Sequence, residues 1–335
     1  MQDAQFYKEI DDGRLQCLLC PRYCKLKPGQ HGFCYVRKNI DGKLKSLVYG
    51  KPYAVNVDPI EKKPLFHFLP GTKILSIGTA GCNMACKHCQ NWDISEAKYN
   101  EARAINLSPE RLIQLALHYN SQSIAYTYNE PTIFAEYAMD TAKMGREMNI
   151  RNVMVTNGYI SAEAIEKVYE NMNAANVDLK SFNENFYQKQ TLSHLQPVLE
   201  SLRKLKSLKV WIEITTLIIP TFNDDSEELI RMCEWIMTEL DSFTPLHLTA
   251  FHPDYKMTNV PATTPSLLLK LRKIAMETGL KYVYVGNISD ADASSTYCHN
   301  CQSLLIRRSW YTTEIVNIKN NMCLKCGAII PGVYN

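Results

Sequence analysis

Short runs of β-branched and other apolar residues alternate with amphipathic helical stretches from about residue 72 to residue 290. Seven of these runs have the length and composition of strands, and they cover residues 73–77, 123–128, 152–156, 176–179, 210–217, 246–251 and 281–285. Such alternation is typical of a parallel α/β sheet or barrel. The pattern therefore predicts an α/β fold, a partial (β/α) barrel of parallel strands.

Signals for helix boundaries support this count of elements. Ser108 stands before Pro109, the arrangement of an N-cap followed by proline in the first turn, and Thr264 with Pro265 repeats it. Gly279 stands where a helix C-cap belongs. We expect helices to begin after Ser108 and Thr264, and one helix to end at Gly279.

Chemically active residues follow the ends of several predicted strands. They are a cysteine-containing loop after the first strand, Asn129 and Glu130 after the second, Asn157 after the third, Asp178 and Lys180 at the end of the fourth, and His252 after the sixth. In barrels and open parallel sheets, functional sites are built at the carboxyl ends of the strands. We expect these side chains to share one pocket.

Composition is that of a folded globular protein, with 46% hydrophobic and 21% charged residues among 335. A net charge of +3 disfavours a nucleic-acid partner, because phosphate binding usually requires a strong excess of Lys and Arg. No stretch approaches the roughly 18 apolar residues of a membrane span, and the first residues have no signal-peptide core. We expect a cytoplasmic protein without a membrane partner.

The twelve cysteines are interpreted first as metal ligands, because disulfides are rare in a reducing cytoplasm. Eleven fall into three groups: Cys17, Cys20, Cys24 and Cys34; Cys82, Cys86 and Cys89; and Cys298, Cys301, Cys323 and Cys326. Cys233 stands alone in an apolar helical pattern and is expected to be buried. The predicted domains are a cysteine-rich metal-binding module over 1–50, a barrel over 51–292 and a zinc-ribbon-like module over 293–335.

The middle group has C-x3-C-x2-C spacing and follows Gly78-Thr79-Ala80-Gly81, where glycines let a loop wrap closely around a cofactor. Three thiolates can hold three irons of a four-iron cluster and leave the fourth iron open. An amino acid that chelates this iron places a neighbouring sulfonium against the cluster, and electron transfer then breaks a carbon–sulfur bond. The alternative is a zinc site that His88 completes.

The two outer groups have different spacing. Cys298-x2-Cys301 and Cys323-x2-Cys326 match the paired knuckles of a zinc ribbon, and an auxiliary iron–sulfur cluster is the competing interpretation. The N-terminal group has the less regular spacing of Cys17-x2-Cys20-x3-Cys24 followed by Cys34. Either zinc or an auxiliary cluster fits this group.

Several segments carry a resemblance to a known family: residues 58–64 (Asp-Pro-Ile-Glu-Lys-Lys-Pro), the cysteine loop with Gln90-Asn91-Trp92, residues 127–132, 156–158 and 178–180, and both outer cysteine groups. In these segments the chain resembles radical-SAM enzymes of the glycyl-radical-activase-like branch. Within that branch it is most similar to the radical-SAM member of the AmmeMemoRadiSam system. SAM here stands for S-adenosylmethionine.

The resemblance implies roles for the pocket residues. Glu130, with Asn129 before it, takes the place of the Gly-Gly-Glu segment that binds the amino group of SAM in the superfamily. Asn157 and His252 are implied to lie near SAM, and Asp178 and Lys180 to contact SAM or the substrate as catalytic residues. From the residues alone, a simple ion pair between Asp178 and Lys180 stays open.

The predicted activity is reductive cleavage of SAM at a [4Fe-4S] cluster to form a 5′-deoxyadenosyl radical, as in pyruvate formate-lyase activating enzymes. It requires an external low-potential electron donor and a substrate that the sequence does not identify, with a protein substrate suggested by the activase resemblance. Two alternatives stay open: an RNA-modifying radical-SAM enzyme, and a non-catalytic iron–sulfur and zinc scaffold for electron transfer.

Overall fold

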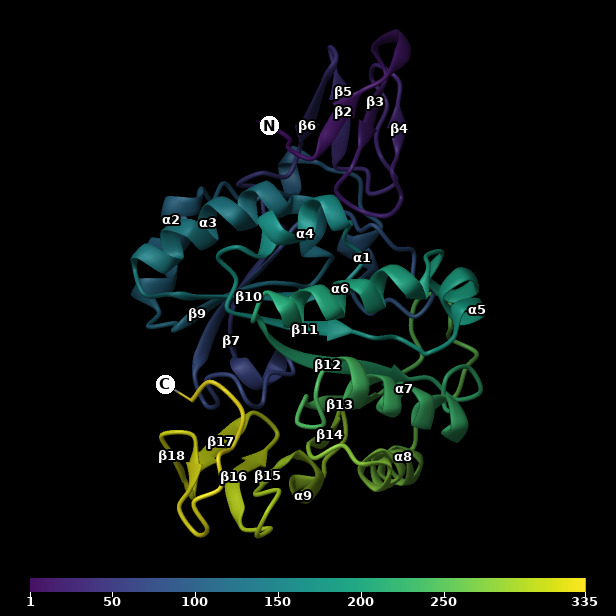
Figure 1. Cartoon of the computed structure of the whole chain (residues 1–335). Helices are drawn as coiled ribbons and strands as arrows, with labels where there is room; N and C mark the ends of the chain where they lie inside the picture. Colours follow the sequence, from purple (N-terminus) through teal and green to yellow (C-terminus); the bar gives the residue numbers. More distant parts are fainter. Residues whose placement is uncertain (335) are drawn as a thin grey trace.

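The computed structural model describes residues 1–334 and contains one eight-stranded sheet at its centre (Figure 1). The strands lie in chain order from one edge to the other: β7 (Ala54–Pro59), β8 (Lys73–Gly78), β9 (Ser123–Tyr126), β10 (Arg151–Thr156), β11 (Ala174–Asp178), β12 (Trp211–Ile218), β13 (Leu246–Ala250) and β14 (Val283–Gly286). Strands β8 to β14 are parallel, and β7 pairs antiparallel with β8. All seven predicted strands and the α/β class are confirmed, whereas β7 was not predicted.

A long helix follows each parallel strand from β8 to β13. These helices are α2 (Pro109–His118), α3 (Ala135–Glu147), α4 (Ala162–Tyr169), α6 (Leu195–Ser207), α7 (Ser226–Glu239) and α8 (Pro265–Thr278), with the short helices α1 (Trp92–Ser95), α5 (Glu184–Phe186) and α9 (Ala291–Ser294) in connections. The predicted caps are confirmed, because the Ser108 side chain accepts from Arg111 N and the Thr264 side chain accepts from Leu267 N. Gly279 ends α8 with a φ of 133°.

Sheet and helices form a continuous apolar core. Cys233 lies in α7 and is fully buried within this core, as predicted.

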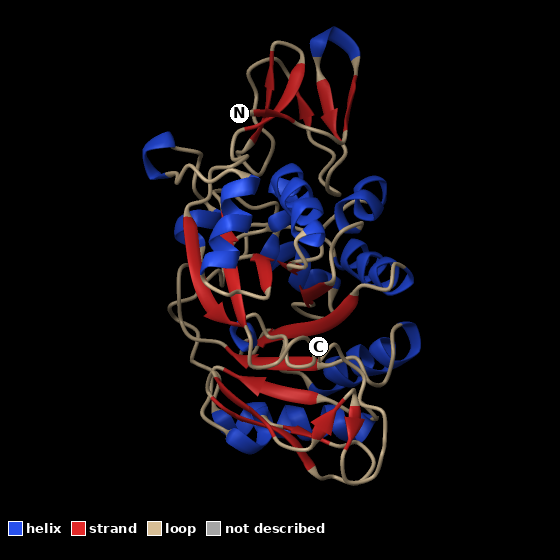
Figure 2. Cartoon of the chain, turned by 90° about the vertical axis from the view of Figure 1, so that its left-hand side faces the viewer, coloured by secondary structure: helices blue, strands red, loops and turns tan. Residues whose placement is uncertain are grey.

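Figure 2 shows the curved sheet with helices packed around it. Because β7 and β14 are the two unpaired edges of the sheet, the barrel is partial, as predicted.

Glu213 of β12 connects segments at the amino end of the barrel. Its carboxylate accepts hydrogen bonds from the backbone N–H groups of Phe66 and His67 at 2.9 and 2.8 Å, from His247 Nε2 at 2.7 Å and from Trp211 Nε1 at 3.1 Å. Burial opposes ionisation, but the hydrogen bond and charge of His247 lower the pKa of Glu213 below its usual value. This buried anion therefore fixes the segment before β8 against β12 and β13.

The first fifty residues form two small sheets at one end of the molecule (Figure 1). One contains β1 (Gln2–Asp3), β6 (Lys43–Ser46) and β5 (Arg37–Ile40), and the other contains β2 (Tyr7–Glu9), β3 (Leu15–Cys17) and β4 (Lys25–Leu26). Arg37 forms an ion pair of 2.8 Å with Glu136 of α3, and both side chains are 2% exposed. This buried pair fixes the N-terminal sheets to the barrel.

Residues 296–334 lie at the opposite end in Figure 1 and contain β15 (Thr296–Tyr297), β16 (Leu304–Ser309), β17 (Thr312–Ile315), β18 (Ile318–Lys319) and β19 (Met322–Cys323). The buried guanidinium of Arg308 donates to the Phe66 carbonyl at 2.6 Å and to Thr296 Oγ1 at 2.7 Å. A small apolar cluster contains Leu305 and Ile306 of this region together with Tyr284 of the barrel. The C-terminal strands therefore share their core with the barrel.

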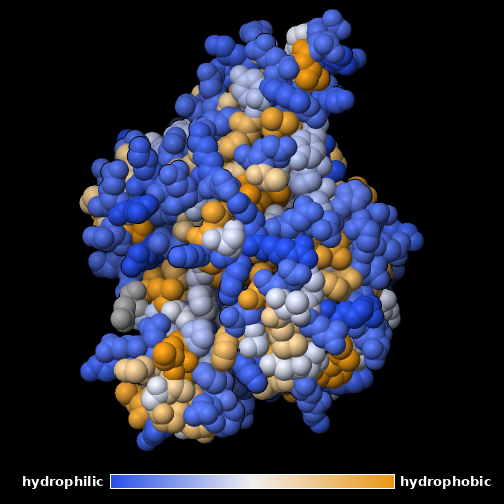
Figure 3. Space-filling view, in the orientation of Figure 1, coloured by the Kyte–Doolittle hydropathy of each residue, from blue (hydrophilic) through white to orange (hydrophobic). Residues whose placement is uncertain are grey.

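The face of the molecule shown in Figure 3 is mostly hydrophilic, with apolar side chains in small groups. Among residues 1–334, no helix has both the length and the apolar character needed to span a bilayer.

We expect Glu213→Ala to lower the free energy of unfolding by about 3–5 kcal/mol, because it leaves buried donors without their acceptor. Thermal and denaturant unfolding measure the change. Glu314→Ala is the matched control, because Glu314 forms only an exposed ion pair with Arg307 and should cost less than about 1 kcal/mol. Equal stability of the two variants would contradict this role for Glu213.

Candidate active site

A cavity of about 420 Å³ lies inside the partial barrel, at the carboxyl ends of the strands. Eight of the nine residues predicted to share one pocket line it: Cys82, Cys86, Cys89, Asn129, Glu130, Asn157, Asp178 and Lys180. The structure thus brings together side chains that are up to 98 positions apart in the chain. His252 is exposed and is not among the residues that line this cavity.

The cysteine loop follows β8 and is held by backbone hydrogen bonds to a distant segment. Ala85 N donates to Thr191 O at 3.0 Å, and Lys87 N donates to Gln190 O at 2.9 Å. Gly81 has a φ of +86°, and a Cβ there would lie 2.2 Å from the carbonyl oxygen of Cys34. This glycine is therefore required by the close approach of the N-terminal region, whereas the sequence predicted only that glycines here let the loop wrap around a cofactor.

The middle cysteine group does not have the geometry of a zinc site. Tetrahedral zinc with ligand bonds of about 2.3 Å needs sulfur and nitrogen ligands within about 4 Å of one another. Among the residues that the structure describes, no three ligand atoms of Cys82, Cys86, His88 and Cys89 lie within 4.8 Å of one another. Burial lowers the pKa of His88 to about 3, so its imidazole is neutral, and its Nδ1 has no hydrogen-bond partner within residues 1–334.

Three thiols around one cavity suit a larger inorganic group. Burial raises the pKa of Cys86 to about 12, which disfavours a free thiolate at neutral pH. A bound metal supplies the positive charge that thiolates need in such a place. Three thiolates can hold three irons of a four-iron cluster, so three cysteines around one cavity suit such a cluster.

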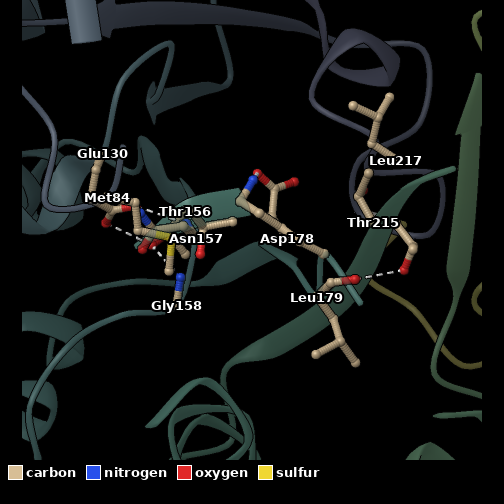
Figure 4. A network of polar contacts seen from close by, with 12 residues as sticks. Met84, Glu130, Thr156, Asn157, Gly158, Asp178, Leu179, Thr215 and Leu217 are labelled. Atoms are coloured by element: carbon tan, nitrogen blue, oxygen red, sulfur yellow. Dashed lines mark hydrogen bonds and ion pairs between the residues drawn. The ribbon is translucent and has the colours of Figure 1, made fainter. Parts of the chain in front are cut away.

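Glu130 is a buried carboxylate that joins two strand ends. Its Oε1 accepts from Thr132 N at 2.9 Å and from Thr156 Oγ1 at 2.7 Å, and its Oε2 accepts from Asn157 N at 2.7 Å. Figure 4 shows Glu130 beside Thr156 and Asn157. Burial raises the pKa of Glu130. A carboxylate has about four acceptor positions, so one position on Oε2 stays available to a ligand in the cavity.

The two predicted asparagines hold the cysteine loop. The side-chain amide of Asn129 accepts from Thr79 N at 3.0 Å and donates to Gly81 O at 2.7 Å. Asn157 Nδ2 donates to Asn83 Oδ1 at 2.9 Å and lies 3.9 Å from Cys82 Sγ. The Asn129 amide therefore positions the start of the loop, and Asn157 connects the loop to β10.

Asp178 and Lys180 form an ion pair, with Lys180 Nζ 2.8 Å from Asp178 Oδ2. Both lie at the end of the fourth parallel strand as predicted: β11 ends at Asp178, and Lys180 follows it in the connection. Burial disfavours the charged amine, but the charge and hydrogen bond of Asp178 raise the pKa of Lys180 above its usual value. Lys180 is therefore a cation beside the cysteine loop.

Three charged or phenolic side chains of the site were not assigned from the sequence. Buried Asp58 accepts hydrogen bonds of 2.8 Å from Lys63 Nζ and from the Tyr128 hydroxyl, and both donors line the cavity. Burial opposes its ionisation, but hydrogen bonds from Lys62 and Lys63 hold the pKa of Asp58 well below its usual range. The signal in the sequence was the resemblance of residues 58–64, which begin at the end of the unpredicted strand β7, and of residues 127–132, which contain Tyr128.

The C-terminal strands also reach the cavity. Tyr311, in the turn between β16 and β17, is one of its lining residues and is 50% exposed. Lys62 also lines the cavity, and its side chain is 47% exposed. The cavity therefore meets solvent on the side where Lys62 and Tyr311 lie.

The two outer cysteine groups differ in geometry. Cys298 Sγ lies 3.6 Å from Cys326 Sγ, and Cys301 Sγ lies 3.7 Å from Cys323 Sγ. All four of these sulfurs are within 4.8 Å of one another, so they could hold a metal ion. The N-terminal Cys17, Cys20, Cys24 and Cys34 line a second, smaller cavity.

Comparison with known proteins assigns the class. Residues 76–233, from β8 into α7, match the Radical SAM superfamily. An uncharacterized protein of Methanocaldococcus jannaschii is 43% identical over 329 residues, which are 98% of each chain. The chain belongs to the radical SAM superfamily.

Relatives with assigned activities cover less of the chain. The pyruvate formate-lyase-activating enzyme of Clostridium pasteurianum is 22% identical over 214 residues, 59% of this chain and 87% of that enzyme. The crystal structure of a radical SAM methyltransferase from Sphaerobacter thermophilus has a TM-score of 0.51 and 14% identity, and the match covers 71% of each chain. This last similarity concerns the fold alone.

The protein is therefore a radical SAM enzyme, with homology to the enzymes that activate glycyl-radical enzymes. The family implies a [4Fe-4S] cluster and SAM as cofactors. Three cysteines around one cavity, spread too widely for zinc, fit this cofactor pair.

Proposed function

We propose that SAM is cleaved in the central cavity, with Cys82, Cys86 and Cys89 as the ligands of the cluster. The convergence of these three cysteines with Glu130 and Lys180 on one cavity carries the proposal. The cluster, once bound and reduced, supplies the electron that breaks a carbon–sulfur bond of SAM to give methionine and a 5′-deoxyadenosyl radical.

The polar side chains have separate proposed roles. Glu130 binds the amino group of SAM through the free acceptor position on Oε2, since a carboxylate suits an ammonium group. Lys180 has two further N–H donors beyond its bond to Asp178, and it binds the carboxylate of SAM or an anionic group of the substrate. Asn129 and Asn157 position the cysteine loop. His252 is exposed, so its proposed contact with SAM requires a movement of the loop after β13.

The proposed substrate is a protein segment that enters on the side of Lys62 and Tyr311. Support comes from the similarity to pyruvate formate-lyase-activating enzymes and to the 4-hydroxyphenylacetate decarboxylase activating enzyme of Clostridioides difficile. The electron comes from an external low-potential donor. The cysteine groups at both ends support a place in the radical-SAM group of the AmmeMemoRadiSam system.

We also propose that the C-terminal cysteines bind zinc. In a tetrahedral zinc site with bonds of about 2.3 Å, neighbouring sulfurs are about 3.8 Å apart. The distances of 3.6 and 3.7 Å fit this value. A four-iron cluster, in which each thiolate binds a different iron, holds its sulfurs farther apart than a single ion does, so the compact C-terminal group favours zinc.

Anaerobically reconstituted and reduced protein should convert SAM to methionine and 5′-deoxyadenosine, which chromatography with mass detection measures. Replacement of Cys82, Cys86 or Cys89 by Ala should abolish the products, because each cysteine holds one iron. Cys233→Ala is the matched control and should keep full cleavage, since Cys233 lies buried in α7. Full cleavage by the triple Ala variant would disprove the assignment.

Glu130→Gln should weaken SAM binding at least about tenfold, which is about 1.4 kcal/mol, because the ligand amine loses its carboxylate partner. Iron content should stay at the wild-type value. Anaerobic calorimetry measures the affinity, and melting temperatures check that the strand ends stay in place. Glu147→Gln, at the exposed end of α3, is the control. An unchanged affinity in Glu130→Gln would remove Glu130 from the binding site.

The double variant Cys323→Ala with Cys326→Ala should lose one zinc per chain and keep the iron of the cysteine loop. Zinc binding contributes on the order of 10 kcal/mol to small zinc modules, so residues 295–334 should lose protection from hydrogen exchange. The barrel strands should stay protected, because most of their core lies elsewhere. Iron in place of zinc at these sulfurs would overturn the zinc assignment.

A further inference from the structure

The N-terminal cysteine group lies where the small N-terminal sheets meet the barrel. Cys17, Cys20, Cys24 and Cys34 line one small cavity of about 20 Å³. Asn83 and Ile133 of the barrel also line it. The four cysteines are therefore not scattered over the surface but converge on one enclosed place beside the cysteine loop.

The spread of these sulfurs differs from that of the C-terminal group. Among the described residues, the C-terminal cysteines are the ones whose sulfurs all lie within 4.8 Å of one another, and no three of the N-terminal sulfurs do so. Cys82, Cys86 and Cys89 share the wider spread. Within one chain, the N-terminal group thus resembles the cluster-binding loop and not the zinc-like site, where neighbouring sulfurs are about 3.8 Å apart.

Two of the N-terminal sulfurs lie beside the same short backbone segment, residues 32–33. A Cβ added to Gly32 would lie 3.8 Å from Cys24 Sγ and 3.8 Å from Cys34 Sγ, so both sulfurs face the same glycine. Phe33 N donates to Cys24 Sγ at 3.5 Å. Backbone N–H groups directed at cysteine sulfur are typical of the surroundings of iron–sulfur clusters.

Arg37 gives an independent indication of an anionic group in this cavity. Its side chain is 2% exposed and lines the cavity, and within the described part of the chain its Nε has no hydrogen-bond partner. The other guanidinium nitrogens donate to Glu136 and to Gln5 O. A buried donor without an acceptor is costly, so an anionic occupant beside Nε would remove this cost.

We propose that Cys17, Cys20, Cys24 and Cys34 bind a second iron–sulfur cluster, with Arg37 directed at it. The cluster lies against the cysteine loop, because the Cys34 carbonyl packs on Gly81 and Asn83 lines the N-terminal cavity. Cys82, a proposed ligand of the SAM-cleaving cluster, lies between Gly81 and Asn83 in the chain. The proposal concerns metal binding and is independent of SAM cleavage.

The test is iron and zinc counting with Mössbauer spectroscopy on full-length protein that is reconstituted anaerobically. In the triple variant with Cys82, Cys86 and Cys89 replaced by Ala, we expect two to four irons per chain and the spectrum of an iron–sulfur cluster. Wild-type protein should hold about four irons more than this variant. Both should hold one zinc, at the C-terminal cysteines.

A second variant protects the test against misfolding. Cys17→Ala with Cys20→Ala should lose the additional iron and keep about four irons in the cysteine loop. Its control, Cys233→Ala, should keep all of the iron. Zinc in place of iron at the N-terminal site, shown by two zinc ions in the triple variant and one in Cys17→Ala with Cys20→Ala, would overturn the proposal. Wild-type protein with only about four irons would overturn it as well.

Discussion

Close backbone packing at the start of the cysteine loop is the constraint on which the site depends. A Cβ on Gly78 would lie 2.7 Å from Thr127 O, and a Cβ on Gly81 would lie 2.2 Å from Cys34 O. The loop therefore passes between the β9 end and the N-terminal sheets without room for a side chain. This passage sets the positions from which Cys82, Cys86 and Cys89 face the cavity.

Buried carboxylates connect the remaining parts of the site. Glu130 joins the ends of β9 and β10, Asp58 joins β7 to Lys63 and Tyr128, and Glu213 joins β12 to the segment before β8. Each accepts several hydrogen bonds, which offset the cost of burying its charge. Glu130 and the neighbours of Asp58 line the cavity, so the same ionic contacts that stabilise the barrel also shape the site.

The sequence alone determined the parallel strands, the helix caps at Ser108 and Thr264, and the cysteine spacing of the loop. These features follow from local rules, because hydrophobic periodicity, cap preferences and ligand spacing act over a few neighbouring residues. It also predicted a shared pocket for Glu130, Asn157 and Asp178, because parallel strands end at one edge of a sheet. Strand β7 was missed, because its half-exposed residues do not form an apolar run.

Only the tertiary structure decided which distant groups meet. Nothing in the sequence around Tyr311 predicts that it lines the same cavity as Lys62. The positions of the N-terminal sulfurs likewise depend on how two small sheets pack. The same holds for His252, which follows a strand end yet is exposed. Spacing along the chain fixes how far apart ligands can lie, but long-range packing fixes where their sulfurs and nitrogens point. For that reason eleven of the twelve cysteines gather in three groups, of which the C-terminal one brings four sulfurs within 4.8 Å of one another.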